Sequence, residues 1–421
     1  MKERIAIIGS GIAGMACAYT LHPKYAISVF EQQDYAGGHT NTCYVQENGR
    51  LIPIDTGFIV FNCENYPNLM RLFAQLGVPL KKTSMSFSAY YQPDEIQYCG
   101  SSLSLLFAQR KNIFSARYLR FLLQIKRFNK ECTEVLYDKS LQYLSVAAYL
   151  QLKRYDIEFL NWYILPMTSA LWSTPPEVSA QFPVLSLVRF FYNHGMLGLN
   201  TQFQWYTVDG GSEVYKQKII NGYSNRIYTC SPVSCITLTD DKVRLIFNSG
   251  SSLEFDKVII ATHADQADRL ITSTRLDPNH LLKHFTYQLN KTVLHTDSAV
   301  MPPLRKIWSS WNYKVTRKQN ALHASTTYWM NSLQQVSDKE QYFVTLNDAG
   351  EIAPHKVIKE LDYYHPVFSV EALRAQEKLS TLNTNGRVYF CGSYFGNGFH
   401  EDALVSGLWV CESITGDNFI L

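Results

Sequence analysis

The sequence lacks any apolar run of the roughly eighteen residues that a membrane-spanning helix needs, so no transmembrane helix is expected. It also lacks a strong charge imbalance, since the formal net charge is +3 over 421 residues. Near-balanced charge gives no general attraction for nucleic acid, and no such partner is predicted. Hydrophobic residues make up 46% of the chain, which is enough for a sizeable core.

The nine cysteines include no CxxC pair. Cys230 and Cys235 are too far apart for the usual metal-binding pair, so no metal site is predicted. An odd number of cysteines without framework spacing is typical of a protein in the reducing cytoplasm.

The first forty residues form the most informative stretch. Residues 4–8 are an apolar run, which predicts a buried parallel strand, and residues 12–21 predict a helix. Between them lie Gly9, Gly11 and Gly14 in the spacing GxGxxG, and a second predicted strand, 25–30, ends at Glu31. This order and spacing predict a dinucleotide-binding βαβ unit.

Each residue of this motif has a physical task. Gly9 allows a tight turn, Gly11 lets a pyrophosphate approach the backbone, and Gly14 lets the helix pack on the strand. The first helical residues, Ile12 and Ala13, offer backbone N–H groups to phosphates. Glu31 is placed to accept the ribose hydroxyls and disfavours the 2′-phosphate of NADP. The alternatives are an ordinary glycine turn, or a signal peptide over residues 2–21, which the glycine-rich centre disfavours.

Gly37, Gly38 and His39 follow the second predicted strand. Together with the first motif, they resemble the FAD fingerprint of the flavin-containing amine oxidase and phytoene desaturase superfamily. The resemblance implies further cofactor contacts, from Gly57 and Phe58 in a loop that approaches the flavin, from Val233 at the adenine, and from Ala261 after a strand that returns to the nucleotide domain.

The C-terminal segment resembles the final motif of the same superfamily. A strand is predicted over 387–391 and a helix over 403–413, with Gly392 and Gly398 between them. The resemblance implies that the helix N-terminus, with His400, Glu401, Asp402 and Ala403, points at the flavin, where N–H groups stabilise negative charge. Simple N-capping would also explain the acidic residues.

Aromatic segments predict the walls of an apolar pocket. The predicted pocket residues are Trp172, Trp311, Asn312, Tyr328 and Trp329, although core packing explains them equally well. Lys306 lies in a stretch loosely similar to the neighbourhood of the lysine that some amine oxidases place near the flavin, and it is the weak candidate for a catalytic residue. Cys391 does not match an attachment position, so non-covalent FAD is predicted.

Residues 112–130 predict a basic amphipathic helix, and residues 101–130 contain no acidic residue. The favoured interpretation is a core-facing helix with a solvated basic side. The alternative is a helix that lies on a membrane surface and gives access to lipid substrates. Peripheral membrane contact therefore stays open beside the predicted cytoplasmic location.

Over nearly the whole chain, the sequence also resembles a bacterial family described as predicted flavin-containing amine oxidoreductases. Its shared segments include Leu294-His-Thr-Asp and Trp308-Ser-Ser-Trp-Asn-Tyr. The resemblance implies an α/β fold with a discontinuous Rossmann-like FAD domain, 1–75, 203–285 and 380–421, and an inserted α+β substrate domain, 76–202 and 286–379. Because members often accompany cyclopropane-fatty-acyl synthase-like methyltransferases, acyl chains are weakly implied as substrates.

Three functions remain open at this point. The first is an FAD oxidoreductase that takes a hydride from an apolar, acyl-chain or amine substrate onto flavin N5. The second is an FAD-dependent isomerase without net oxidation, and the third is a non-catalytic binder on the same fold. The intact glycine and Glu31 motif disfavours the binder. The sequence predicts neither the electron acceptor nor the oligomeric state.

Overall fold

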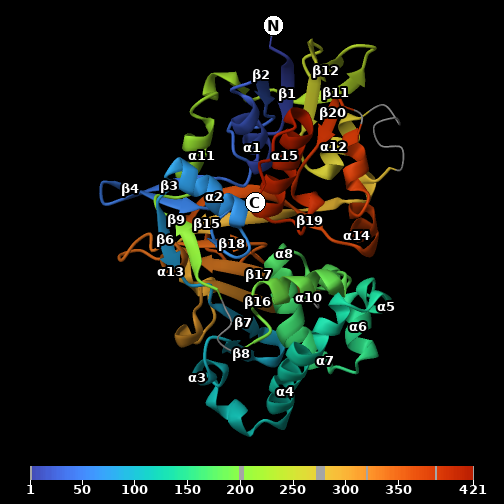
Figure 1. Ribbon diagram of the computed structural model, residues 1–421. Helices are drawn as coiled ribbons and strands as arrows, with labels where there is room; N and C mark the ends of the chain where they lie inside the picture. Colours follow the sequence, from blue (N-terminus) through green and yellow to red (C-terminus); the bar gives the residue numbers. More distant parts are fainter. Residues whose placement is uncertain (1, 199–202, 272–279, 319–320, 385, 421) are drawn as a thin grey trace.

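The computed structural model describes residues 2–198, 203–271, 280–318, 321–384 and 386–420. Two main sheets organise these residues, one near the N-terminus and one in the lower half of the view in Figure 1. The predicted α/β architecture with a Rossmann-like sheet is confirmed.

The first sheet is parallel and has the strand order β10-β2-β1-β14-β20. Its strands are β1 (Arg4–Ile8), β2 (Ala26–Phe30), β10 (Ile227–Tyr228), β14 (Lys257–Ile260) and β20 (Val388–Phe390). Three distant parts of the sequence therefore build one sheet. The near-continuous apolar runs predicted buried strands, and the structure buries both faces of β1.

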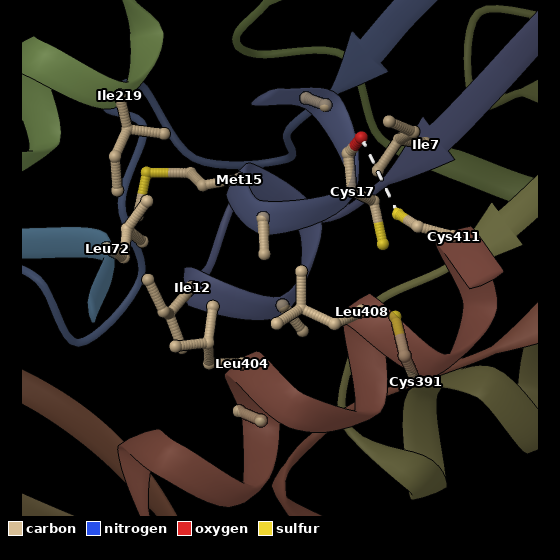
Figure 2. Close-up of a cluster of buried hydrophobic side chains, with 14 of the residues drawn as sticks. Ile7, Ile12, Met15, Cys17, Leu72, Ile219, Cys391, Leu404, Leu408 and Cys411 are labelled. Carbon is tan, nitrogen blue, oxygen red and sulfur yellow. Dashed lines mark hydrogen bonds between the residues drawn. The ribbon is translucent and has the colours of Figure 1, made fainter. Parts of the chain in front are cut away.

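Alternate side chains of β1 enter two different cores. Ile5 and Ile7 pack with α1 (Ile12–Leu21), α2 (Pro67–Leu76), α11 (Glu213–Ile220) and α15 (His400–Thr415), the core drawn in Figure 2. Ala6 and Ile8 pack on the opposite side with the antiparallel sheet β11 (Val233–Leu238), β12 (Val243–Phe247) and β13 (Ser252–Phe255), and with α12 (Ala264–Leu270) and α14 (Val370–Gln376). The result is a layered domain in which the parallel sheet is covered on both faces.

The second sheet is mixed and has seven strands in the order β19-β15-β18-β17-β16-β7-β8. Its strands are β7 (Phe87–Tyr91), β8 (Ile96–Cys99), β15 (Thr286–His295), β16 (Trp311–Lys318), β17 (Ala321–Trp329), β18 (Phe343–Leu346) and β19 (Val357–Val367). One end of this sheet packs against α4 (Ala116–Glu131), α6 (Val146–Leu152), α7 (Ile157–Phe159), α8 (Leu165–Trp172) and α10 (Val184–Asn193).

Two small sheets and two short helical segments lie between the larger elements. The hairpin β3 (Thr42–Glu47) and β4 (Arg50–Asp55) follows the first motif. Strands β5 (Phe61–Asn62), β6 (Leu80–Thr83) and β9 (Trp205–Val208) form a three-stranded sheet. The short helix α3 (Leu103–Leu106) and the 3-10 helix η2 (Arg110–Phe114) precede α4.

The predicted domain division stays a prediction. Strand β6 lies in the predicted 76–202 segment but pairs with β9 in the predicted 203–285 segment. Residue 202, at that predicted boundary, lies outside the described residues. Within the ranges given above, no helix is both long enough and apolar enough to cross a bilayer.

Two predicted helices have different bounds in the structure. The C-terminal helix begins at His400, three residues before the predicted start, because the Asp402 carboxylate accepts the backbone N–H of Phe399 at 2.8 Å. The predicted helix over 112–130 is interrupted, because the Ser115 side chain accepts from the Tyr118 N–H and caps α4 there. Phe114, expected on its buried face, precedes the cap and is 91% exposed.

Proline usually breaks a helix, but Pro166 lies in a helical segment that continues past it. A π-helix, η4 (Leu160–Ile164), runs directly into α8, since the Leu165 N–H donates to the Leu160 carbonyl oxygen. Pro166 therefore follows a π-helical turn, where the regular α-helical hydrogen-bond pattern is already interrupted. The helix ends at Trp172, where Ser173 takes a left-handed conformation.

Candidate functional site

A large cavity of about 1460 Å³ lies between the two main sheets. One end is lined by the segments that follow β1, β2, β14 and β20, at the carboxyl edge of the parallel sheet. The other end is lined by side chains of β7, β16, β17, α8 and α10. Ligands of open α/β sheets bind at that carboxyl edge, so the cavity is in the expected place for a dinucleotide.

The turn from β1 into α1 forms the floor of the first end. A Cβ atom at Gly11 would meet nothing within 4 Å, so the backbone there is open to the cavity. Gly38 closes on this turn from the other side, since a Cβ on Gly38 would lie 3.2 Å from the Gly11 Cα. Ile12 and Ala13, the first residues of α1, also border the cavity, and their N–H groups lack partners within the helix.

Glu31 borders the cavity with its carboxylate held in place by the first motif. One oxygen, Oε2, accepts from the Ser10 N–H at 3.0 Å and the Ser10 hydroxyl at 2.6 Å. The other oxygen, Oε1, accepts from the Gln33 N–H at 3.0 Å. A carboxylate has about four acceptor sites, so three are used and only part of the predicted capacity for two ribose hydroxyls is left.

Ser10 is a residue that the motif analysis missed. Besides donating to Glu31, its hydroxyl accepts the Gly37 N–H at 3.1 Å, which joins the three segments of the fingerprint. Its position between Gly9 and Gly11 could have pointed to a role in the motif, but the GxGxxG pattern does not require a serine there.

The N-terminus of α15 meets the cavity through His400. Its ring stacks on Phe58 at a centroid distance of 3.8 Å, and its Nε2 lies 2.7 Å from the Tyr215 hydroxyl. That hydroxyl also lies 2.5 Å from Thr40 Oγ1. The imidazole is therefore fixed from two sides, and burial lowers its pKa to about 3, so that it is neutral at pH 7.

The two acidic residues at this helix start face away from the cavity lining. Glu401 accepts from the backbone N–H groups of Asn68 and Leu69, at 2.8 and 3.0 Å, and so caps α2. Asp402 accepts from Phe399, and burial raises its pKa to about 7. Both carboxylates thus have structural partners.

Three histidine and two tyrosine side chains line the middle of the cavity. His39 stacks on Tyr363 at 4.9 Å and lies 5.2 Å from His365, between ring centroids. His263 stacks on Tyr287 at 4.3 Å. Burial lowers the pKa of His39 and His263 to about 4 and that of His365 to about 3. His39 was predicted from the first motif, but sequence spacing carried no signal for Tyr287, Tyr363 and His365, because β15 and β19 bring them to that motif only in the folded chain.

The other end of the cavity is apolar and aromatic. Trp172 lies 5.9 Å from Phe190, and Phe190 lies 5.3 Å from Phe399, between ring centroids. Trp311 and Tyr328 form an edge-to-face pair at 5.2 Å. The Trp172 Nε1 donates to the Asn397 carbonyl oxygen at 3.3 Å, which ties this aromatic end to the loop before α15. We call these five side chains the aromatic end.

The predicted site residues fall into two groups. Those that border the cavity are Gly9, Gly11, Ile12, Ala13, Glu31, Gly38, His39, Gly57, Phe58, Trp172, Val233, Ala261, Trp311, Tyr328, Gly392, Gly398, His400 and Ala403. Those outside its lining are Gly14, Gly37, Lys306, Asn312, Trp329, Glu401 and Asp402.

Four of the residues outside the lining have other surroundings. Asn312 is buried and donates to the carbonyl oxygens of Ser309 and Thr327. The Trp329 Nε1 donates to Gln341 at 2.7 Å, and Gly14 packs against the Gly9 carbonyl. Lys306 is exposed on the short 3-10 helix η8 (Arg305–Ile307) and takes no part in the functional proposal below.

Tyr394 borders the cavity, whereas Phe395 packs beside it with the ring centroids 5.0 Å apart. In the described part of the chain, no group of three or more His, Cys, Asp or Glu side chains is arranged to hold a metal ion.

Comparison with known proteins supplies a family for this arrangement. A profile of the family described as "Flavin containing amine oxidoreductase" matches residues 12–415. Among curated proteins, the 1-hydroxycarotenoid 3,4-desaturase of Flavobacterium sp. (strain P99-3) is 31% identical over 153 residues, which are 34% of this chain and 29% of the desaturase. The match thus spans less than a third of the length of that relative.

Solved structures resemble the whole chain in fold. A cofactor-binding variant of putrescine oxidase has a TM-score of 0.70 at 14% identity and covers 99% of this chain and 100% of its own. The CLA-producing fatty acid isomerase from P. acnes has a TM-score of 0.68 at 13% identity and covers 97% of this chain and 98% of its own. At these identities the likeness concerns the fold alone.

Proposed function

Since the chain belongs to the family of flavin containing amine oxidoreductases and FAD is its cofactor, we propose that it is an FAD-dependent oxidoreductase acting on an apolar substrate. The observation that carries this proposal is the continuous cavity from the dinucleotide motif to the aromatic end. Pockets for one small ligand measure about 300–1,000 Å³. A cavity of about 1460 Å³ has room for a substrate beside the cofactor.

The residues present fit FAD. The open backbone at Gly11, with the start of α1, would receive the pyrophosphate, and Glu31 retains an acceptor site for the ribose. His400 and the start of α15 would lie at the flavin end. When bound, the flavin supplies a hydride acceptor. We also propose that the FAD is held non-covalently, and that the domains follow the predicted bounds.

The aromatic end would bind the substrate and exclude water from it. None of its five side chains carries a charge, so the aromatic end itself provides no carboxylate partner for an ammonium group; Asp348, Glu360 and Asp362 border the same cavity but do not belong to the aromatic end. Burying an unpaired cation is costly, which favours an apolar substrate such as an acyl chain over an amine. The neutral imidazoles of His39, His263 and His365 would surround the cofactor without adding positive charge at pH 7.

The test is an absorbance spectrum of the purified protein, followed by anaerobic addition of a long-chain fatty acid or of a primary amine. We expect bands near ~450 nm from the flavin that bleach with the acyl chain and not with the amine. Trp172→Ala should raise the acyl concentration needed for bleaching by roughly tenfold or more, since burying one large aromatic side chain is worth on the order of 1.5–3 kcal/mol. Trp409→Ala is the matched control, because Trp409 is 48% exposed and outside the cavity lining.

Three results would change this proposal. A colourless protein that cannot be reconstituted with FAD would refute it and leave a binding protein. Bleaching by the amine alone would make the protein an amine oxidase. A yellow protein that nothing bleaches, yet that converts an unsaturated acyl chain to an isomer without any acceptor, would establish the second candidate, a flavin-dependent isomerase on the fold it shares with the fatty acid isomerase.

A further inference from the structure

The segment from α3 to α4 exposes an unusual number of large apolar side chains. Their exposed fractions are 75% for Leu103, 42% for Ile113, 91% for Phe114, 40% for Leu119 and 66% for Leu123. We call these five residues, with the Lys and Arg residues of the segment 101–130, the α3–α4 surface. In Figure 1 the segment that joins α3 to α4 is at the lower end of the molecule, far from β1 and β2.

These side chains are not displaced core residues. Helix α4 already buries Tyr118, Phe121 and Phe128 on its inner face. Leu119 and Leu123 are four residues apart on the outer face, and Lys126 and Lys130 continue the same stripe. The outer face of α4 therefore carries two exposed apolar residues followed by two basic ones along one stripe, which is unlike an ordinary polar outer face.

The charge around the apolar residues is of one sign. Residues 101–130 contain seven Lys and Arg residues and no Asp or Glu. Arg117 and Arg120 form ion pairs with Glu158 and Asp156, and Arg127 pairs with Glu131 within α4. For Arg110, Lys111 and Lys126, no ion pair is found within 4 Å among the described residues, so their charge is available to a partner.

From this pattern we propose that the α3–α4 surface binds the surface of a bilayer that contains anionic phospholipid. Exposed Phe and Leu side chains flanked by Lys and Arg match an interface that is apolar inside and anionic at its headgroups. A protein partner is disfavoured because lysine is depleted at protein–protein interfaces. A nucleic acid offers no apolar phase for Phe114 and Leu123. The contact goes beyond the proposed redox function and does not depend on bound flavin.

The experiment is co-sedimentation of the full-length holoprotein with vesicles of phosphatidylcholine alone, or of phosphatidylcholine with phosphatidylglycerol. We expect binding to the anionic vesicles that weakens as salt is raised, because exposed charges are screened. The double variant Phe114→Ser, Leu123→Ser should bind the anionic vesicles roughly tenfold or more weakly. Lys111→Gln with Lys126→Gln should weaken binding by roughly tenfold, and only to the anionic vesicles.

Matched controls lie elsewhere on the surface. Leu51→Ser removes a leucine that is 63% exposed on β4, and Lys339→Gln removes an exposed lysine, so both should bind as the wild type does. Thermal unfolding of every variant checks that it is folded, as expected for substitutions at exposed positions.

Equal sedimentation with both kinds of vesicle, or unchanged binding by both double variants, would overturn the proposal. Light scattering could also overturn it. If the wild type is a dimer that does not bind vesicles and the Phe114→Ser, Leu123→Ser variant is a monomer, the α3–α4 surface binds a second copy of the chain instead of a bilayer. A protein that keeps the absorbance of bound flavin but does not bind vesicles would refute this proposal alone and leave the redox function standing.

Discussion

Gly11 and Gly14 belong to one motif but have different physical roles. A Cβ at Gly14 would lie 2.0 Å from the Gly9 carbonyl oxygen, whereas a Cβ at Gly11 would meet no atom within 4 Å. Gly11 also has φ −63° and ψ 179°, which any residue can adopt. One glycine is therefore needed for packing, and the other keeps space for a ligand.

This difference predicts opposite results for two similar substitutions. Gly11→Ala should leave the thermal stability of the apoprotein unchanged and weaken FAD binding by roughly tenfold or more, which is on the order of 1.4 kcal/mol. Gly14→Ala should destabilise the fold itself by about 1–3 kcal/mol. Fluorescence titration with FAD and unfolding of the apoprotein measure the two effects. Loss of apoprotein stability in Gly11→Ala would contradict the ligand role.

At the scale of elements, the cavity depends on how α11 and α15 are held together. Tyr215 of α11 is fully buried, and its hydroxyl joins Thr40 to His400 at the start of α15. The imidazole of His400 is thereby fixed where the helix N-terminus meets the cavity. Neither residue would set this geometry alone, because the contact joins positions 185 residues apart.

Tyr215→Phe should therefore affect both stability and the bound cofactor. The change leaves two buried polar groups without a partner and should cost about 1–3 kcal/mol of unfolding free energy. It should also shift the flavin absorbance spectrum or reduction potential, since His400 is no longer held. The control is Tyr223→Phe, which removes a buried hydroxyl donor to the Met15 carbonyl oxygen at 3.2 Å in the same layer. Identical flavin properties in both variants would reduce Tyr215 to a structural role.

At the scale of the whole molecule, we expect six histidines with lowered pKa to make the fold sensitive to acid. Burial lowers the pKa from 6.5 to about 4 for His39, His194, His263 and His295 and to about 3 for His365 and His400. Between pH 6.5 and about 4 the unfolded chain binds protons on these residues and the folded chain does not. The free energy of unfolding therefore falls as pH decreases through this window.

Three carboxyl groups act in the opposite direction. Burial raises the pKa of Asp55 to about 6, that of Asp402 to about 7 and that of Glu401 above its usual value, so the folded chain binds these protons first as pH falls. Six histidines outnumber three carboxyls, and we expect net acid destabilisation between pH 6.5 and 4. Urea unfolding at several pH values with saturating FAD measures it.

His295 allows the origin of the pH effect to be tested outside the cavity. Its ring nitrogens contact the Asp297 N–H at 3.0 Å and Thr345 Oγ1 at 2.7 Å. His295→Asn should flatten the pH dependence by up to about 1.4 kcal/mol per pH unit, the value of one proton. An unchanged slope in this variant would mean that other groups cause the acid response.

The sequence by itself determined the dinucleotide half of this protein. Residues 4–31 carry strand, glycines, helix and acid in consecutive order, and local chain geometry brings them together in nearly any fold that forms the βαβ unit. The family resemblance and the FAD cofactor followed from these local motifs. No role was predicted for Ser10, because its hydrogen bonds reach Glu31 and Gly37, which the spacing of the glycines does not specify.

Only the tertiary structure decided the other half of the cavity. Trp311 and Trp329 looked equivalent in the sequence, but only Trp311 borders the cavity. His365 reaches His39 through the pairing of β15 with β19, across more than 300 residues. Such contacts depend on the register of distant strands and on helix packing, and no local spacing encodes either. Likewise, Phe114 is exposed because Ser115 caps α4, so the helix begins at Ala116 and its buried apolar face begins at Tyr118.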